Sequence, residues 1–403
     1  MIQKTRIHPE DPETSSPTNP ELLGERNEIL GHAFHLLLKT SSLIGITYKN
    51  SPKNRNFFLV NCWDSLILIL NVFSYTVSIL TINSIITVVQ MQLTFYAFFT
   101  LGLLIRISLL IKRRRVFLTI SHASYLYDNL GLNIGKCLRG MQYIIISFYF
   151  WFFLITTLLV LYIRGIIMST SDIEIFSFSL RRSGSSALVV IVAICIMFCA
   201  VVTTVTIYIS LVLCCSFYIV AKDVLKRYGV KLVEASTEYI NKDILISYIS
   251  GYKKIVFCFD EINSSVSFCS LLLYAASVTC FFNTISVIAV FDMEALWNHI
   301  ALLGESVLTF IMSFVIFFSL TGTGSGANLA HSFLKVKVLE SVENIFDKTS
   351  SEVEVMAAYK MLAQSIANIP TSFTAGDMFT INKALILTTA GALVTYGVII
   401  FGN

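Results

Sequence analysis

Long apolar runs recur along this chain, and each is long enough to cross a lipid bilayer as a single helix. A transmembrane helix needs about 20 predominantly apolar residues, because the hydrocarbon core is about 30 Å thick and a helix rises about 1.5 Å per residue. The runs of this length are residues 57–81, 84–111, 140–163, 186–216, 266–291, 301–323 and 384–401. The chain of 403 residues is 55% hydrophobic and only 13% charged, which is about half the charge content of a soluble domain. We therefore expect an all-α polytopic membrane protein with seven transmembrane helices.

The chain before the first span has a different character. Residues 1–26 contain four prolines and almost no large apolar side chain, which is typical of a disordered tail and lacks the apolar run of a signal peptide. The apolar stretch at 33–47 is shorter than a span and is interrupted by Lys39. We expect residues 27–56 to form an interfacial or re-entrant helix in preference to an eighth crossing.

The lysines and arginines lie mostly on one side of this map. They gather in the tail before residue 57, after residue 111 and in the long inner loops at 217–265 and 324–383. The opposite side holds only Arg164, Arg181 and Arg182. Because cytoplasmic loops retain positive charge, the basic segments are expected inside the cell. The N-terminus is then inside, the tail is cytoplasmic, and seven crossings place the C-terminus outside.

The inner segment 324–383 carries two stripes of apolar residues at helical spacing. The first stripe is Leu334, Val338, Val342, Ile345 and Phe346, and the second is Val355, Tyr359, Leu362, Ile366 and Ile369. Such stripes predict amphipathic helices that form a cytoplasmic anchor bundle. The bundle could hold several subunits together, or the stripes could pack within one subunit, and the spacing alone leaves both alternatives open.

The sequence offers no pattern for catalysis or metal binding. The six histidines are scattered, and the TGTGSG run at 321–326 follows an apolar run instead of a strand and lacks the Lys-Ser/Thr ending of a phosphate loop. We expect these glycines to allow close helix packing or a flexible exit. The basic residues form no continuous face, which argues against nucleic acid as a partner. We therefore expect a protein that is not an enzyme and that has no catalytic residue, cofactor or metal.

Polar residues inside the apolar runs indicate where a ligand could bind, because burying them among lipid tails is costly. Those that fall at a similar depth in the outer half of their spans are Gln90, Gln92, Asn283 and Glu305, with Trp297 in the loop just above. Amides, a carboxylate and an aromatic ring together suit a small polar or aromatic ligand. Hydrogen bonds between helices are the alternative for each residue.

The C-terminal stretch from residue 375 reads AGDMFTINKALILTTAGALVTYGVIIFGN. It resembles the C-terminal signature of the insect gustatory receptor family, a group related to the insect odorant receptors. The residues that match this signature are Gly376, Phe379, Asn382, Thr395 and Tyr396. The signature ends in Gln-Phe, where this chain has Gly402 and Asn403.

The resemblance implies a gustatory-type chemoreceptor, a ligand-gated non-selective cation channel opened by a small external tastant. It implies a homotetramer, or a hetero-oligomer with related receptor subunits, whose last helix in residues 384–403 lines the pore. It places the ligand pocket within residues 57–323, in the outer half, and the protein among the membrane lipids of the plasma membrane of sensory neurons. By position, the pore and gate residues would be Tyr396, Ile399, Ile400, Phe401, Gly402 and Asn403.

A G-protein-coupled receptor and a membrane transporter are the alternatives. The first also has seven spans but requires the opposite orientation, which the charge distribution opposes. A transporter should show paired broken helices or an internal repeat, and neither is evident. The sequence leaves open whether the ligand is a sugar, a bitter compound, carbon dioxide or another molecule.

Overall fold

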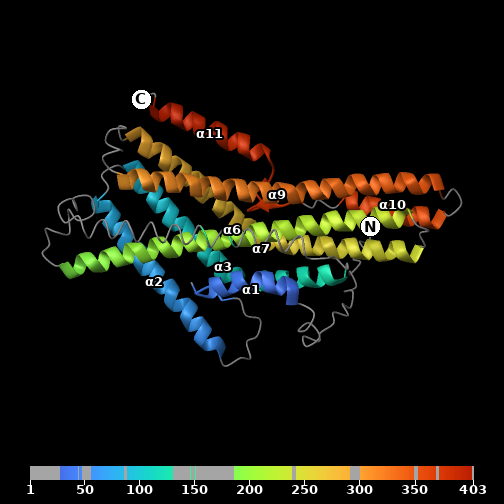
Figure 1. Ribbon diagram of the computed structural model, residues 1–403, viewed down its shortest axis with the longest axis horizontal. Helices are drawn as coiled ribbons and strands as arrows, with labels where there is room; N and C mark the ends of the chain where they lie inside the picture. The colour runs from blue at the N-terminus through green and yellow to red at the C-terminus, as the bar shows by residue number, and fades with distance from the viewer. Residues whose placement is uncertain are drawn as a thin grey trace, which may run out of the picture.

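The chain folds into an elongated bundle of helices with one small hairpin (Figure 1). The computed structural model describes residues 28–43, 45–47, 56–85, 89–129, 146, 150, 186–237, 242–290, 300–348, 353–368 and 372–401. The expected tail at 1–26 and the expected span at 140–163 lie outside these residues, apart from the single positions 146 and 150.

Helices occupy the other six predicted spans. They are α2 (Asn56–Ile85), α3 (Val89–Asn129), α6 (Ser186–Thr237), α7 (Lys242–Val290), α9 (Ile300–Lys348) and α11 (Ala384–Phe401). Among the described residues, α2, α3, α6, α7 and α9 are long and apolar enough to cross a membrane, and α11 is a shorter apolar helix. The prediction of an all-α membrane protein is therefore confirmed.

Three helices are much longer than a membrane crossing. Helices α6, α7 and α9 contain 52, 49 and 49 residues. Each is therefore about 75 Å long, more than twice the thickness of the hydrocarbon core. They run along the long axis of the molecule, with α10 (Val353–Asn368) beside one half (Figure 1). We call the half with α10 the inner half and the opposite one the outer half.

The segment 217–265, expected on the inner side between two spans, is helical for most of its length. Helix α6 continues to Thr237, and α7 begins at Lys242. The apolar content falls here, but an apolar face persists on both helices. Leu225 and Leu232 of α6 and Ile255 and Ile262 of α7 are 1% exposed. This face packs within the bundle and keeps the segment helical beyond the membrane.

The described residues of the two apolar stripes pack within the chain. Leu334 and Val338 of α9 and Tyr359, Leu362 and Ile366 of α10 are at most 1% exposed. Helix α10 contacts α7 and α9. Burying an aliphatic side chain of this size stabilises a fold by about 1.5–3 kcal/mol. The two expected amphipathic helices are thus present, and the same subunit covers these side chains.

Helix α6 lies at the centre of the bundle, in contact with α2, α3, α7 and α9. Two of its buried tyrosines, Tyr218 and Tyr228, are hydrogen bonded to α7, as is usual for buried polar groups. The Tyr218 hydroxyl lies 2.7 Å from Ser270 Oγ of α7. Tyr228 donates to the backbone oxygen of Tyr248 at 2.7 Å. These bonds hold α6 and α7 together at two points along the bundle.

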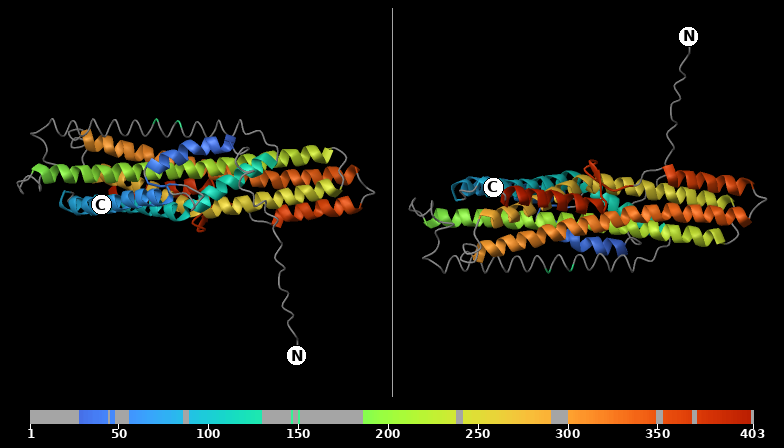
Figure 2. Two further views of the ribbon diagram at one scale, coloured as in Figure 1. Left: turned by 90° about the horizontal axis from the view of Figure 1, so that it is seen from below. Right: turned by 90° about the horizontal axis from the view of Figure 1, so that it is seen from above.

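Helix α1 (Glu28–Leu43) packs against α3 and α6 on one face of the bundle (Figure 2). Its 16 residues span only about 24 Å, less than the thickness of the bilayer core. Phe34 and Leu37 are at most 3% exposed. Helix α1 is therefore a short helix docked on the bundle, and it is too short to be a crossing.

A polar network fixes the segment after α1. The chain turns at Gly45, whose φ is 74°, and the buried Arg106 of α3 donates to the Gly45 oxygen at 3.5 Å. Asp64 of α2 accepts from Arg113 Nη1 at 3.0 Å and from Thr47 Oγ1 at 2.9 Å. The network therefore joins α2 and α3 to the segment that follows α1.

A hairpin connects the inner half to α11, and the sequence reading did not foresee it. Strands β1 (Thr374–Ala375) and β2 (Phe379–Thr380) pair antiparallel. Gly376 and Asp377 have φ of 59° and 58°, and the Met378 nitrogen donates to the Ala375 oxygen at 3.1 Å. Two successive residues with positive φ are typical of a type I′ turn, which favours glycine and aspartate.

Candidate functional site

Helix α11 lies at the edge of the bundle and touches α7 (Figure 1). Most of its side chains are apolar, and many are exposed: Leu387 is 77% exposed, Val394 67% and Val398 67%. A Cβ atom added at Gly391 or Gly397 would meet nothing within 4 Å. An apolar helix with this much free surface needs lipid or another protein against it.

The outer part of α11 is held to α7 through one tyrosine. The rings of Tyr396 and Phe282 meet edge to face, with centroids 4.4 Å apart. The Tyr396 hydroxyl lies 3.1 Å from Ser286 Oγ, one helical turn beyond Phe282. Tyr396 is therefore both a pore residue predicted from the signature and the contact between α11 and a span expected to line the ligand pocket.

The inner end of α11 is held through the hairpin. The Gly376 nitrogen donates to the Ser267 backbone oxygen at 2.9 Å, and the Asp377 nitrogen donates to Ser267 Oγ at 3.2 Å. The Thr374 nitrogen donates to Asn263 Oδ1 at 3.0 Å. Both partners belong to α7, so the hairpin is bonded directly to this helix.

Helix α9 contacts the hairpin on the side opposite α7. Asn328 accepts from the Phe373 nitrogen and donates to the Ile381 oxygen, both at 2.8 Å. A Cβ atom at Gly324 would lie 2.7 Å from Ile381 Cγ2, so only glycine fits there without displacement. Close packing is thus the role of this glycine in the TGTGSG run.

The residues of the C-terminal signature build this connection. Gly376 forms the turn, and a Cβ atom there would lie 2.5 Å from Leu271 Cδ2. Phe379 packs edge to face on Tyr274 of α7, with centroids 5.6 Å apart. Asn382 Oδ1 accepts from the Leu385 nitrogen at 3.2 Å, which caps the start of α11. Another residue of this set, Thr395, is exposed and donates to the Gly391 oxygen within α11 at 2.9 Å.

The predicted ligand residues are only partly visible in the structure. Gln92 of α3 and Asn283 of α7 are half-buried, and Asn283 directly follows Phe282, the partner of Tyr396. Gln90 lies in the first turn of α3 and Glu305 in the second turn of α9, but their side chains are outside the described residues, as is the whole of Trp297. The ligand pocket formed by these residues therefore stays a prediction.

The predicted gate residues lie at the outer end of α11. Ile399 is 58% exposed. The backbone of Ile400 and Phe401 completes the helix, and Gly402 and Asn403 are outside the described residues. The sequence reading missed Ser286, Ser267, Asn263 and Asn328, which hold α11 and its hairpin. Each is a polar residue on a long helix, and only its position opposite residues 373–396 reveals its role.

No protein family model matches this chain, and no curated protein sequence matches it. Solved structures do match it. The structure of the insect olfactory receptor OR5 from Machilis hrabei superposes with a TM-score of 0.70 at 14% sequence identity, covering 91% of this chain and 98% of the receptor. The structure of the same receptor in complex with eugenol also gives a TM-score of 0.70 at 14% identity, covering 93% and 99%.

The match extends over almost the full length of both chains, so it concerns the whole arrangement of helices. The matching solved structures are receptors and not enzymes. At 14% sequence identity the match shows the fold alone, and the function must be argued from the residues of the site. This chain has the fold of the insect odorant and gustatory receptors.

Proposed function

We propose that this protein is a chemoreceptor subunit, a ligand-gated non-selective cation channel that opens when a small external molecule binds in the outer half. The observation that carries the proposal is the pair of connections between α7 and α11. Tyr396 joins the two helices in the outer half, and the hairpin at Gly376 joins them at the inner end. A displacement of α7 by a ligand is therefore passed to α11.

The free surface of α11 supports a pore made from several subunits. Leu387, Val394 and Val398 are more than half exposed, and the side of α11 at Gly391 is open. Identical helices from four subunits, or from related subunits in a hetero-oligomer, would cover this surface and enclose a channel. Ile399, Ile400 and Phe401 would form its apolar outer constriction, which can close by dewetting.

The energy required from each ligand is modest in such an assembly. Moving the closed-to-open ratio from about 1:99 to 99:1 takes about 5.5 kcal/mol of differential binding, which is about 1.4 kcal/mol for each of four sites. One or two hydrogen bonds that improve in the open state would supply it. Half-buried amides such as Gln92 and Asn283 suit this task.

The olfactory receptor with the same fold was solved in complex with eugenol, a small molecule. For this chain we propose a ligand that is likewise small, with an apolar body and at least one polar group. A gustatory role with an external tastant, in the plasma membrane of sensory neurons, follows from the C-terminal signature at Gly376 to Tyr396.

The experiment is current recording from cells that express the chain at their surface, during application of a panel of small aromatic and sugar compounds that begins with eugenol. An evoked cation current whose relative permeabilities change in a Val398→Asn variant would support the proposal. An evoked current with unchanged permeabilities in variants at Val394, Val398 and Ile399 would contradict the assignment of α11 to the pore.

A further inference from the structure

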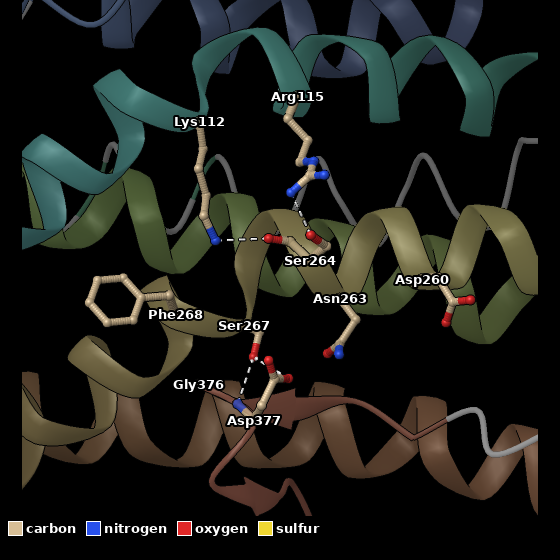
Figure 3. A pocket seen from close by; sticks show the side chains of 9 residues that line it. All are labelled: Lys112, Arg115, Asp260, Asn263, Ser264, Ser267, Phe268, Gly376 and Asp377. Carbon is tan, nitrogen blue, oxygen red and sulfur yellow. Dashed lines mark hydrogen bonds between the residues drawn. The ribbon is translucent and has the colours of Figure 1, made fainter.

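A polar cavity lies where α3, α7 and the hairpin meet, away from the expected ligand pocket (Figure 3). Its volume is about 280 Å³. This is many times the volume of a water molecule, about 30 Å³, and close to the lower end of small-molecule sites, about 300 Å³. The cavity can therefore take an organic group, and the described residues suggest which one.

Opposite charges line opposite walls of this cavity. Lys112 and Arg115 enter from α3, while Asp377 enters from the hairpin and Asp260 from the inner side of α7 (Figure 3). Lys112 donates to the Ser264 oxygen at 2.8 Å, and Arg115 donates to Ser264 Oγ at 2.7 Å. A lysine has three donors and an arginine has five, so both keep donors for a ligand.

The two carboxylates likewise have oxygen atoms that remain available to accept hydrogen bonds from a ligand. Asp377 accepts from Thr374 Oγ1 at 2.8 Å and lies 3.5 Å from Ser267 Oγ, both through Oδ1. No bond is found to its Oδ2 atom within the described part of the chain. Asp260 is exposed and makes no hydrogen bond or ion pair with the described residues. The cavity thus has two cations and two carboxylates, and its formal charge is zero.

The cavity sits at the inner boundary of the membrane. The predicted spans end at residue 111 on α3 and begin at residue 266 on α7. On the membrane side of this boundary, Ile111 is 77% exposed and Phe268, which lines the cavity, is 43% exposed. On the other side, Arg115 and Asp260 are exposed. An amphiphile could place its polar group in the cavity and its chain along Phe268.

We infer that this cavity binds the zwitterionic headgroup of a phosphatidylethanolamine from the inner leaflet. The phosphate would accept from Lys112 and Arg115, and the ammonium would donate to Asp377, with the charge of Asp260 adding a longer-range attraction. A net anionic headgroup would gain the first contacts but be repelled by the two carboxylates. A choline headgroup has no N–H donor for them. The lipid would bridge α3 to the hairpin that begins α11.

The test is native mass spectrometry of the purified full-length chain with phosphatidylethanolamine, phosphatidylcholine or phosphatidylglycerol added at equal concentration. We expect phosphatidylethanolamine to bind at least about tenfold more tightly than either other lipid, the difference that one charge-assisted hydrogen bond provides. In a further experiment, soluble phosphoethanolamine is added as a competitor of the lipid. Competition by it at similar concentration would show that a free phosphate ester is the ligand instead of the lipid and would overturn the inference.

Charge variants make the test sharper. Lys112→Gln should lower the affinity for phosphatidylethanolamine about tenfold, and Asp260→Asn with Asp377→Asn should reverse the preference toward phosphatidylglycerol. Asparagine tolerates the positive φ at position 377, so the turn is kept. Arg114→Gln, an exposed cation outside the cavity, is the matched control and should change nothing.

A second readout follows the hairpin directly. Bound phosphatidylethanolamine should slow amide hydrogen exchange at residues 374–381 by at least about fivefold, and Asp260→Asn alone, an exposed substitution that spares the hairpin, should weaken this protection. A wild-type preference for phosphatidylglycerol, equal binding of all three lipids, or an unchanged preference in the asparagine variants would overturn the inference.

Discussion

The hydroxyl groups of Tyr396 in α11 and Ser286 in α7 lie 3.1 Å apart, and the Tyr396 ring rests edge to face on Phe282. Asn283, a predicted ligand residue, comes directly after Phe282 in the chain. This contact links the helix expected to bind a ligand with the helix expected to line the pore. It is therefore the place where loss of a single oxygen atom should alter gating.

Tyr396→Phe removes the hydroxyl and keeps the ring. A net hydrogen bond contributes about 0.5–1.5 kcal/mol, which changes an equilibrium roughly 2- to 12-fold. Because the bond is proposed to pass a displacement of α7 to α11, we expect a smaller ligand-evoked current and a higher half-maximal ligand concentration. Tyr125→Phe, the same change at an exposed residue of α3, is the control. Whole-cell current recording makes the measurement, and equal behaviour of both variants would remove Tyr396 from the gating path.

Gly324→Ala and Gly322→Ala form a matched pair on α9. A methyl group at position 324 would lie 2.7 Å from the buried Ile381, whereas one at position 322 would meet nothing within 4 Å. Overpacking costs about 1–3 kcal/mol, and replacing an open helical glycine by alanine gains up to about 1 kcal/mol. Thermal unfolding of the detergent-solubilised protein should show a lower Tm for the first variant and an equal or higher Tm for the second. The reverse order would mean that α9 does not pack on the hairpin in this way.

Asp64→Ala should destabilise the contact between α2 and α3 near the inner ends of their spans. The Asp64 side chain is 5% exposed and its partner Arg113 is 30% exposed, so the pair lies between a surface and a buried one. We expect a loss of about 2 kcal/mol, above the roughly 0–1 kcal/mol of exposed pairs and below the roughly 3–5 kcal/mol of broken buried ones. The comparison variant is Asp223→Ala, which breaks the pair with Arg227 one turn away on α6. Its expected loss is about 0.5 kcal/mol, and denaturant unfolding should separate the two.

Gln92→Ala and Asn283→Ala test the predicted pocket. If these half-buried amides bind the ligand, each substitution should raise the half-maximal concentration of an active compound about tenfold without lowering surface expression, because one good hydrogen bond is lost. Gln364→Ala removes an exposed amide from α10 in the inner half and serves as the control. Dose–response curves for the compound found active in the panel give the answer. Unchanged curves for both variants would show that the amides serve helix packing.

The spans were predictable because apolar length decides them. The last helix was expected at 384–401 and is found at Ala384–Phe401, and the first span was expected from 57 and begins at Asn56. The inner helices were only partly predictable. The stripes at Leu334 and Tyr359 identified α9 and α10, whereas the weaker pattern at 217–265 hid the continuation of α6 and α7.

The hairpin and the inner cavity depend on contacts between residues far apart in the chain. Asn328 meets Phe373 and Ile381, and Ser267 meets Gly376, although more than 40 positions separate each pair in the sequence. A glycine and an aspartate at positions 376 and 377 suit many turns, and only the partners on α7 and α9 select this one. Local patterns do not carry that information.

The central claim is that the chain is an inverted seven-helix channel subunit whose last helix ends outside the cell. The most direct measurement is antibody access to a short epitope added after Asn403 in intact cells, with a permeabilised control and an independent surface label. The account predicts staining of intact cells. Staining only after permeabilisation, with the surface label present, would contradict it and would favour a receptor coupled to G proteins.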